Sequence, residues 1–109
     1  MNEPTVPEID VEQLARRREE GAFVLDVREP YEYEAGHVPG AVLIPLGEVV
    51  ARHDEVPADQ EVYVICQVGA RSARAAEFLN GSGHRTTNVA GGTRSWVEAG
   101  FGVTEGGNP

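Results

Sequence analysis

Residues 62–72 read VYVICQVGARS, and this stretch decides the fold. Its first four residues are β-branched or aromatic, a run typical of a buried strand. The strand is expected to end at Cys66, the only cysteine of the chain, and a helix is expected to start at Ser72 and run to about Asn80. The stretch therefore predicts a strand, a tight loop and a helix, with a thiol at the carboxyl end of the strand.

The same alternation of short apolar runs and helical patterns continues along the chain. Strands are expected at 23–25, 41–44 and 86–89. Helices are expected after a cap at Asp10, with Gln13 as its capping-box partner, and after a cap at Thr93. Such alternation predicts an α/β domain with a parallel sheet covered on both faces. Ligands bind beyond the carboxyl ends of the strands in sheets of this kind. The residues expected at or just past those ends are Asp26, Cys66 and Gly91.

Length, charge and cysteine content narrow the function classes. The chain has 109 residues, which predicts one domain, at residues 8–102, between flexible ends at 1–7 and 103–109. Its net charge of −9 disfavours nucleic acid and anionic membranes as partners. A single cysteine cannot form an internal disulfide, and we expect neither a signal peptide nor a membrane span. These features favour a reducing compartment, the cytoplasm.

The loop after Cys66 offers three features that stabilise a thiolate. A helix N-terminus presents unpaired N–H groups, Gly69 permits a turn that aims successive amides inward, and Arg71 adds a positive charge. The alternative interpretation is that Cys66 is a small apolar residue at the end of a strand. The position of the cysteine between strand and helix, together with the arginine, favours a reactive thiol.

The spacing between cysteine and arginine separates two chemistries. Phosphatases that use a cysteine place five residues between it and the arginine, whereas four residues, Gln67 to Ala70, lie between Cys66 and Arg71. The shorter loop encloses a smaller cup, which suits one extra sulfur atom better than a phosphoryl group. A phosphatase or an arsenate-handling enzyme stays the less favoured alternative.

Several motifs together resemble a single-domain rhodanese. They span residues 8 to 101 and have the order and spacing of that family. They are Leu25-Asp26-Val27-Arg28-Glu29, Gly36-His37-Val38-Pro39-Gly40-Ala41, Cys66 to Ser72, and Gly91-Gly92 with Trp96.

The resemblance implies a fold, a reaction and a set of site residues. The implied fold is a doubly wound domain around a five-stranded, mostly parallel sheet. The implied reaction is a ping-pong sulfur transfer with no metal or organic cofactor, in which Cys66 takes the outer sulfur of thiosulfate or a persulfide as its own persulfide. The sulfur then passes to cyanide or to a thiol such as glutathione or thioredoxin. The implied anion cradle consists of Gln67, Val68, Gly69, Ala70 and Arg71.

Other residues of the motifs are expected to support the loop. Asp26 and Arg28 resemble a buried polar pair of the family; Arg28 would pair with Glu32, or Asp26 would accept loop hydrogen bonds. His37 is expected to be structural, Ser72 to start the helix, and Gly91-Gly92 to let the backbone pass close to the Cys66 loop. His53 and His84 are expected at the surface. Because Gln67 and Val68 carry no charge, thiosulfate is expected to bind weakly, and a protein or small-molecule persulfide is the better donor. A sulfur relay or protein-binding module that serves only a partner is the main alternative to an enzyme.

Overall fold

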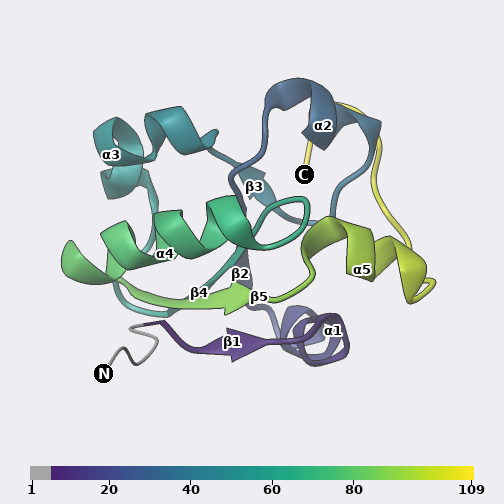
Figure 1. Cartoon of the computed structure of the whole chain (residues 1–109), viewed down its shortest axis with the longest axis horizontal. Coiled ribbons are helices and arrows are strands. Elements are labelled where there is room, and N and C mark those ends of the chain that lie inside the picture. Colours follow the sequence, from purple (N-terminus) through teal and green to yellow (C-terminus); the bar gives the residue numbers. More distant parts are fainter. Residues whose placement is uncertain (1–5) are drawn as a thin grey trace.

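The structure is a computed structural model that describes residues 6–109. Five strands form one sheet in the order β1-β5-β4-β2-β3 (Figure 1). All four pairings between neighbouring strands are parallel. This confirms the predicted α/β sheet, which is parallel throughout rather than mostly so. The strands are β1 (Glu8–Ile9), β2 (Phe23–Asp26), β3 (Val42–Leu43), β4 (Glu61–Ile65) and β5 (Arg85–Val89).

Helices cover both faces of the sheet, as predicted. The α-helices are α1 (Val11–Glu19), α2 (Pro30–Ala35), α3 (Val49–Arg52), α4 (Ala70–Gly81) and α5 (Gly92–Glu98), and two 3₁₀ turns, η1 (Leu46–Glu48) and η2 (His53–Glu55), flank α3. Among residues 6–109, no helix combines the length and the apolar character that crossing a membrane requires.

The central strand β4 divides the apolar core into two clusters, because successive side chains of a strand point to opposite faces. Val64 lies in the cluster that α3 and α4 cover, with Leu79 from α4. Its neighbour Ile65 lies in the other cluster, with Leu14 from α1 and Trp96 from α5. The near-continuous apolar run before Cys66 is therefore the sequence of a strand that is buried on both sides.

Two helices begin earlier than predicted. α4 starts at Ala70 rather than at Ser72, and its N-cap is Gly69, which has a φ of 115°. α5 starts at Gly92 after the N-cap Gly91, so Thr93 is not a cap. Glycine is the residue that adopts positive φ at little steric cost, and it leaves both hydroxyl side chains free to bond elsewhere. By contrast, Asp10 and Gln13 form the predicted capping box of α1.

The C-terminal segment, which we expected to be loose, is hydrogen-bonded to the domain. It runs from α5 back to α2 (Figure 1). Thr104 pairs with His37 through both backbone groups, at 2.9 Å each, and Gly106 donates to the carbonyl of Glu34. His37 is buried, stacks on Tyr33 and has a backbone carbonyl at each ring nitrogen, which supports the structural role expected for it.

Two further expectations concern the N-terminus and a histidine. Residues 1–5 of the segment expected to be flexible lie outside the described residues, whereas Pro7 accepts a hydrogen bond from the amide of Asn88. His84 was expected at the surface but is buried, because its ring packs against His53 and lies 3.1 Å from the carbonyl of Pro57.

Gly92 brings the start of α5 against the loop that follows β4. A Cβ atom at this position would lie 2.6 Å from backbone atoms of Cys66 and Gln67, and the φ of Gly92 is +60°. Neither backbone can yield without moving the loop, so only glycine fits. This confirms the expected close passage at Gly91-Gly92.

We therefore expect Gly92→Ala to lower the free energy of unfolding by roughly 2–5 kcal/mol, from the left-handed conformation and the clash together. Gly21→Ala is the matched control, because Gly21 also has a positive φ (+90°) but nothing lies within 4 Å of its added Cβ. Urea unfolding of the control should show a loss of only about 1–2 kcal/mol. Equal losses for the two variants would contradict the close approach.

Candidate functional site

The cysteine loop lies where the central strands end. Cys66 directly follows β4, and the register places Asp26, the last residue of β2, opposite Ile65. The amide of Val27 donates to the carbonyl of Ile65 at 3.0 Å. The sheet thus brings the Asp26–Arg28 segment next to the thiol, as the positions at the strand ends predicted.

Two hydrogen-bond donors point at the sulfur of Cys66. The amide of Gly69 lies 3.1 Å from Sγ, and the hydroxyl of Ser72 lies 3.2 Å from it. The same hydroxyl is 3.2 Å from the carbonyl oxygen of Gly69, so its one proton serves either acceptor. A negative charge on the sulfur favours the bond to Sγ. Ser72 therefore acts on the sulfur instead of starting the helix.

These donors set the ionisation of the buried thiol. Burial alone raises the pKa of Cys66, but hydrogen bonds from the Ser72 hydroxyl and from the amides of Ser72, Gly69 and Val68 outweigh it and lower the pKa below the usual range. The direction follows because each donor stabilises the charged form. The loop thus favours the thiolate, which is the nucleophilic form of cysteine.

The start of α5 orients the loop. The carbonyl of Cys66 accepts hydrogen bonds from the amide and the hydroxyl of Thr93, at 2.9 and 3.0 Å, and the carbonyl of Gln67 accepts one from the amide of Arg94 at 3.1 Å. In a trans peptide the N–H points opposite to the C=O. The Gln67 carbonyl therefore faces α5 while the amide of Val68 faces the sulfur.

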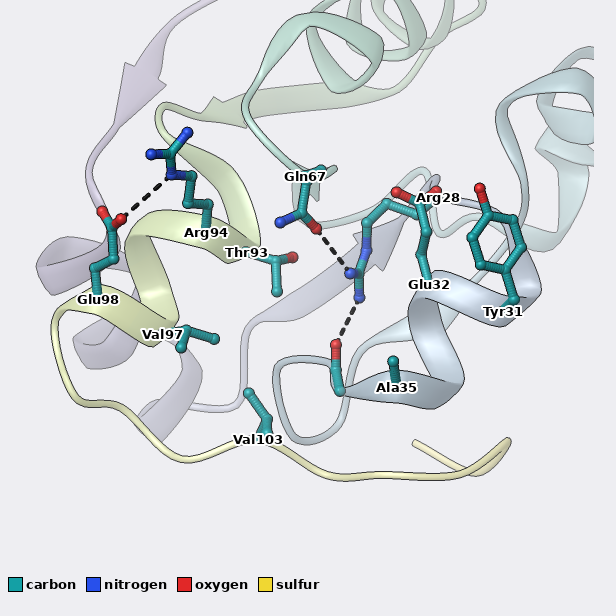
Figure 2. Close-up of a pocket in the computed structure, with 11 residues that line it drawn as sticks. Arg28, Tyr31, Glu32, Ala35, Gln67, Thr93, Arg94, Val97, Glu98 and Val103 are labelled. Atoms are coloured by element: carbon teal, nitrogen blue, oxygen red, sulfur yellow. Dashed lines mark hydrogen bonds and ion pairs between the residues drawn. The ribbon is translucent and has the colours of Figure 1, made fainter.

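Arg28 pairs with Asp26, which corrects the expected pairing with Glu32. Its Nη2 lies 2.9 Å from Oδ2 of Asp26, and both side chains are buried. The same guanidinium also donates hydrogen bonds to the backbone carbonyl of Gly36 and to Oε1 of Gln67, at 2.9 and 3.1 Å (Figure 2). Asp26 therefore acts on the loop only through Arg28, and buried charges paired in this way avoid the cost of an isolated charge.

Arg71 pairs with Glu32 instead. Its Nη1 and Nη2 lie 2.8 and 2.9 Å from the two carboxylate oxygens of Glu32, on α2. The hydrogen bonds to Arg71 lower the pKa of Glu32 to about 2, against the opposing effect of burial. The positive charge expected beside the thiol is thus present but already bound to a carboxylate.

Two contributors escaped prediction from the sequence. Thr93 was expected to cap a helix, and Asn88 was not singled out, yet the Nδ2 of Asn88 lies 3.3 Å from the Gly69 carbonyl. Asn88 is buried on β5, but the mostly polar run RTTNV gave no signal that singled it out. Its position supports the same Gly69 whose amide faces the sulfur.

A pocket of about 720 Å³ opens beside the loop. Gln67 reaches its wall from the loop, and Figure 2 shows α2, α5 and the C-terminal segment around it. Its apolar lining residues are Tyr31, Ala35, Val97 and Val103. No group of three or more His, Cys, Asp or Glu side chains in residues 6–109 could hold a metal ion.

We expect Ser72→Ala to raise the pKa of Cys66, because the variant loses one donor to the thiolate and keeps the amides. At a pH below the pKa of the thiol, alkylation should slow roughly tenfold, since a hydrogen bond to a charged group is worth about 1.5 kcal/mol or more. Alkylation rates measured across pH give the result, with Ser82→Ala, just past the C-terminal end of α4, as control. An unchanged profile in Ser72→Ala would show that the hydroxyl does not act on the sulfur.

Comparisons with known proteins agree with this geometry. A sequence model described as the rhodanese-like domain matches residues 10–99. The chain is 35% identical over 99 residues to a sulfurtransferase of Allochromatium vinosum, covering 88% of this chain and 92% of that protein. It is 42% identical over 99 residues to YrkF of Bacillus subtilis, provisionally named a sulfur carrier protein, covering 88% of this chain and 54% of that protein. The chain thus spans about half the length of this last relative.

Solved structures show the same fold. The structure of a rhodanese-related protein from Thermoplasma volcanium superimposes with a TM-score of 0.85 at 36% identity, covering 90% of this chain and 97% of that one. The match to the family model covers most of the chain, in agreement with the motifs and the sheet. The chain therefore belongs to the rhodanese-like family, which includes the named sulfurtransferase above.

Proposed function

We propose that the protein is a sulfurtransferase that carries sulfane sulfur as a persulfide on Cys66. The observation that carries this proposal is the set of donors that surrounds the only thiol of the chain and lowers its pKa. A thiolate held at the base of an amide-lined loop can attack sulfur, and the same amides can then stabilise the negative charge of the terminal sulfur.

The loading step conserves atoms and charge. The Cys66 thiolate attacks the outer sulfur of thiosulfate, the S–S bond of thiosulfate breaks, and sulfite leaves with the bonding electron pair, which leaves Cys66–S–S⁻. With an organic persulfide, R–S–S⁻, the leaving group is the thiolate R–S⁻. No external oxidant or reductant is needed.

The unloading step returns the thiolate. Cyanide, or the thiolate of an acceptor such as glutathione or thioredoxin, attacks the terminal sulfur and leaves as thiocyanate or as a new persulfide. The residues described offer no second cysteine to resolve the persulfide, so the acceptor comes from outside the chain. A reducing compartment such as the cytoplasm would supply that thiol.

A relay that serves one partner protein is the second candidate function. Two observations support it: the mostly apolar pocket beside the loop, and the relative whose name refers to a sulfur carrier. Both candidates share the Cys66 persulfide and differ in whether small donors and acceptors turn over. A phosphatase is less well supported, because only four residues separate Cys66 from Arg71 and because the guanidinium of Arg71 is already paired with Glu32.

The test is intact-protein mass spectrometry of the wild type and of Cys66→Ser after incubation with thiosulfate or an alkyl persulfide, and again after cyanide. The wild type should gain the mass of one sulfur atom on Cys66 and lose it with cyanide. The variant should gain nothing while its circular dichroism shows a folded chain. A sulfur gain in the folded variant would contradict the proposal; loading by persulfide with no thiosulfate turnover would favour the relay.

A further inference from the structure

Arg71, the only charged residue of the segment 66–72, lies in the first turn of α4 and is held by a side chain from a distant element. Both terminal nitrogens of its guanidinium lie within 2.9 Å of the two oxygens of Glu32. Glu32 is itself fixed, because its Oε1 also accepts the amide of Glu29 at 2.9 Å at the start of α2. The end of the guanidinium that would grip an anion in a bidentate manner is therefore already occupied.

The two arginines that line the pocket beside the loop also have carboxylate partners. Arg28 is paired with the buried Asp26, whereas Arg94 makes one exposed contact, through Nε, with Glu98 at 3.2 Å. Each arginine has its carboxylate in the pocket or next to it. The mouth of the site therefore presents charge pairs of no net charge and apolar side chains.

We propose that Glu32 determines the donor specificity of the site: by holding Arg71, it disfavours a small dianionic donor and favours an organic persulfide whose uncharged body lies in the apolar pocket. This inference rests on the proposed sulfur transfer. Thiosulfate brings two negative charges, and its sulfite leaving group keeps both, so its binding depends on a free cation. An organic persulfide brings one, on the sulfur that the loop amides already face.

The apolar pocket suits the body of an organic donor. Tyr31 on α2 and Val97 on α5 both line this pocket and are exposed, at 74% and 54%. An alkyl or aryl group laid between them would cover apolar surface that now contacts water. The charged sulfonate group of thiosulfate would gain no binding free energy from contact with these apolar side chains.

Glu32→Gln tests the proposal, because it keeps the shape of the side chain and removes its charge. Sulfur transfer to cyanide is measured with thiosulfate and with benzyl persulfide, whose organic part carries no charge. The KM for thiosulfate should fall about five- to tenfold, the strength of one charge-assisted hydrogen bond. The KM for benzyl persulfide should change less than twofold.

Two controls isolate the effect. Glu55, on η2, accepts two hydrogen bonds of 3.0 Å from Arg52. Glu55→Gln therefore changes the net charge of the protein by the same amount as Glu32→Gln. Both KM values should stay the same in this control. Adding Arg71→Gln to Glu32→Gln should return the thiosulfate KM to near the wild-type value. Should Glu32→Gln unfold, Glu32→Asp, which is too short to bridge both nitrogens, should shift the thiosulfate KM in the same direction.

An unchanged ratio of the two KM values in folded Glu32→Gln, or a thiosulfate KM that rises, would overturn the proposal. So would an equal shift in Glu55→Gln. These outcomes leave the proposed function intact, because that function fails if neither donor places sulfur on Cys66 of the wild type, or if folded Cys66→Ser still gains sulfur.

Discussion

The hydrogen bonds that converge on the sulfur of Cys66 are the interaction on which the site depends. A buried thiol would otherwise resist ionisation, and here the Gly69 amide and the Ser72 hydroxyl reverse that effect. The surrounding structure serves this convergence. Gly69 takes positive φ so that its amide turns inward, and Gly92 brings α5 close enough to bind the loop carbonyls. Strand β4, the loop that follows it and helices α4 and α5 therefore all contribute to the surroundings of the Cys66 sulfur.

Paired charges give the site its rigidity and its low net charge. The buried Asp26–Arg28 pair joins the end of β2 to α2 and to the loop, through Gly36 and Gln67. The Arg71–Glu32 pair joins the loop to α2 a second time. Because each of these two guanidinium groups is fixed by a carboxylate, neither Arg28 nor Arg71 is left as a free cation beside the loop. Under the proposed function, such a site would bind a sulfur anion by backbone amides rather than by side-chain charge.

Local signals in the sequence predicted much of this, and tertiary contacts account for the rest. The run before Cys66 predicted the central strand, and Asp10 with Gln13 predicted the α1 cap, because both depend on neighbouring residues alone. Ser72 and Thr93 were taken for helix starts because serine and threonine are common N-caps, whereas glycines two or three positions earlier, Gly69 and Gly91, take those positions. The family resemblance pointed to Asp26 and Arg28 as a buried polar pair, but the partner of Arg71 was beyond sequence reasoning, because Glu32 lies 39 positions away on another element.

The central claim is that the fold lowers the pKa of Cys66 despite burying it. The most direct measurement is the rate of Cys66 alkylation across pH for the native chain and for the same chain unfolded in urea. Because Cys66 is the only thiol, the two profiles report the same atom in two environments. The account predicts a native profile whose midpoint lies at lower pH than the unfolded one, after correction for accessibility. A native midpoint equal to or above the unfolded one would mean that burial prevails over the hydrogen bonds, and would contradict the account.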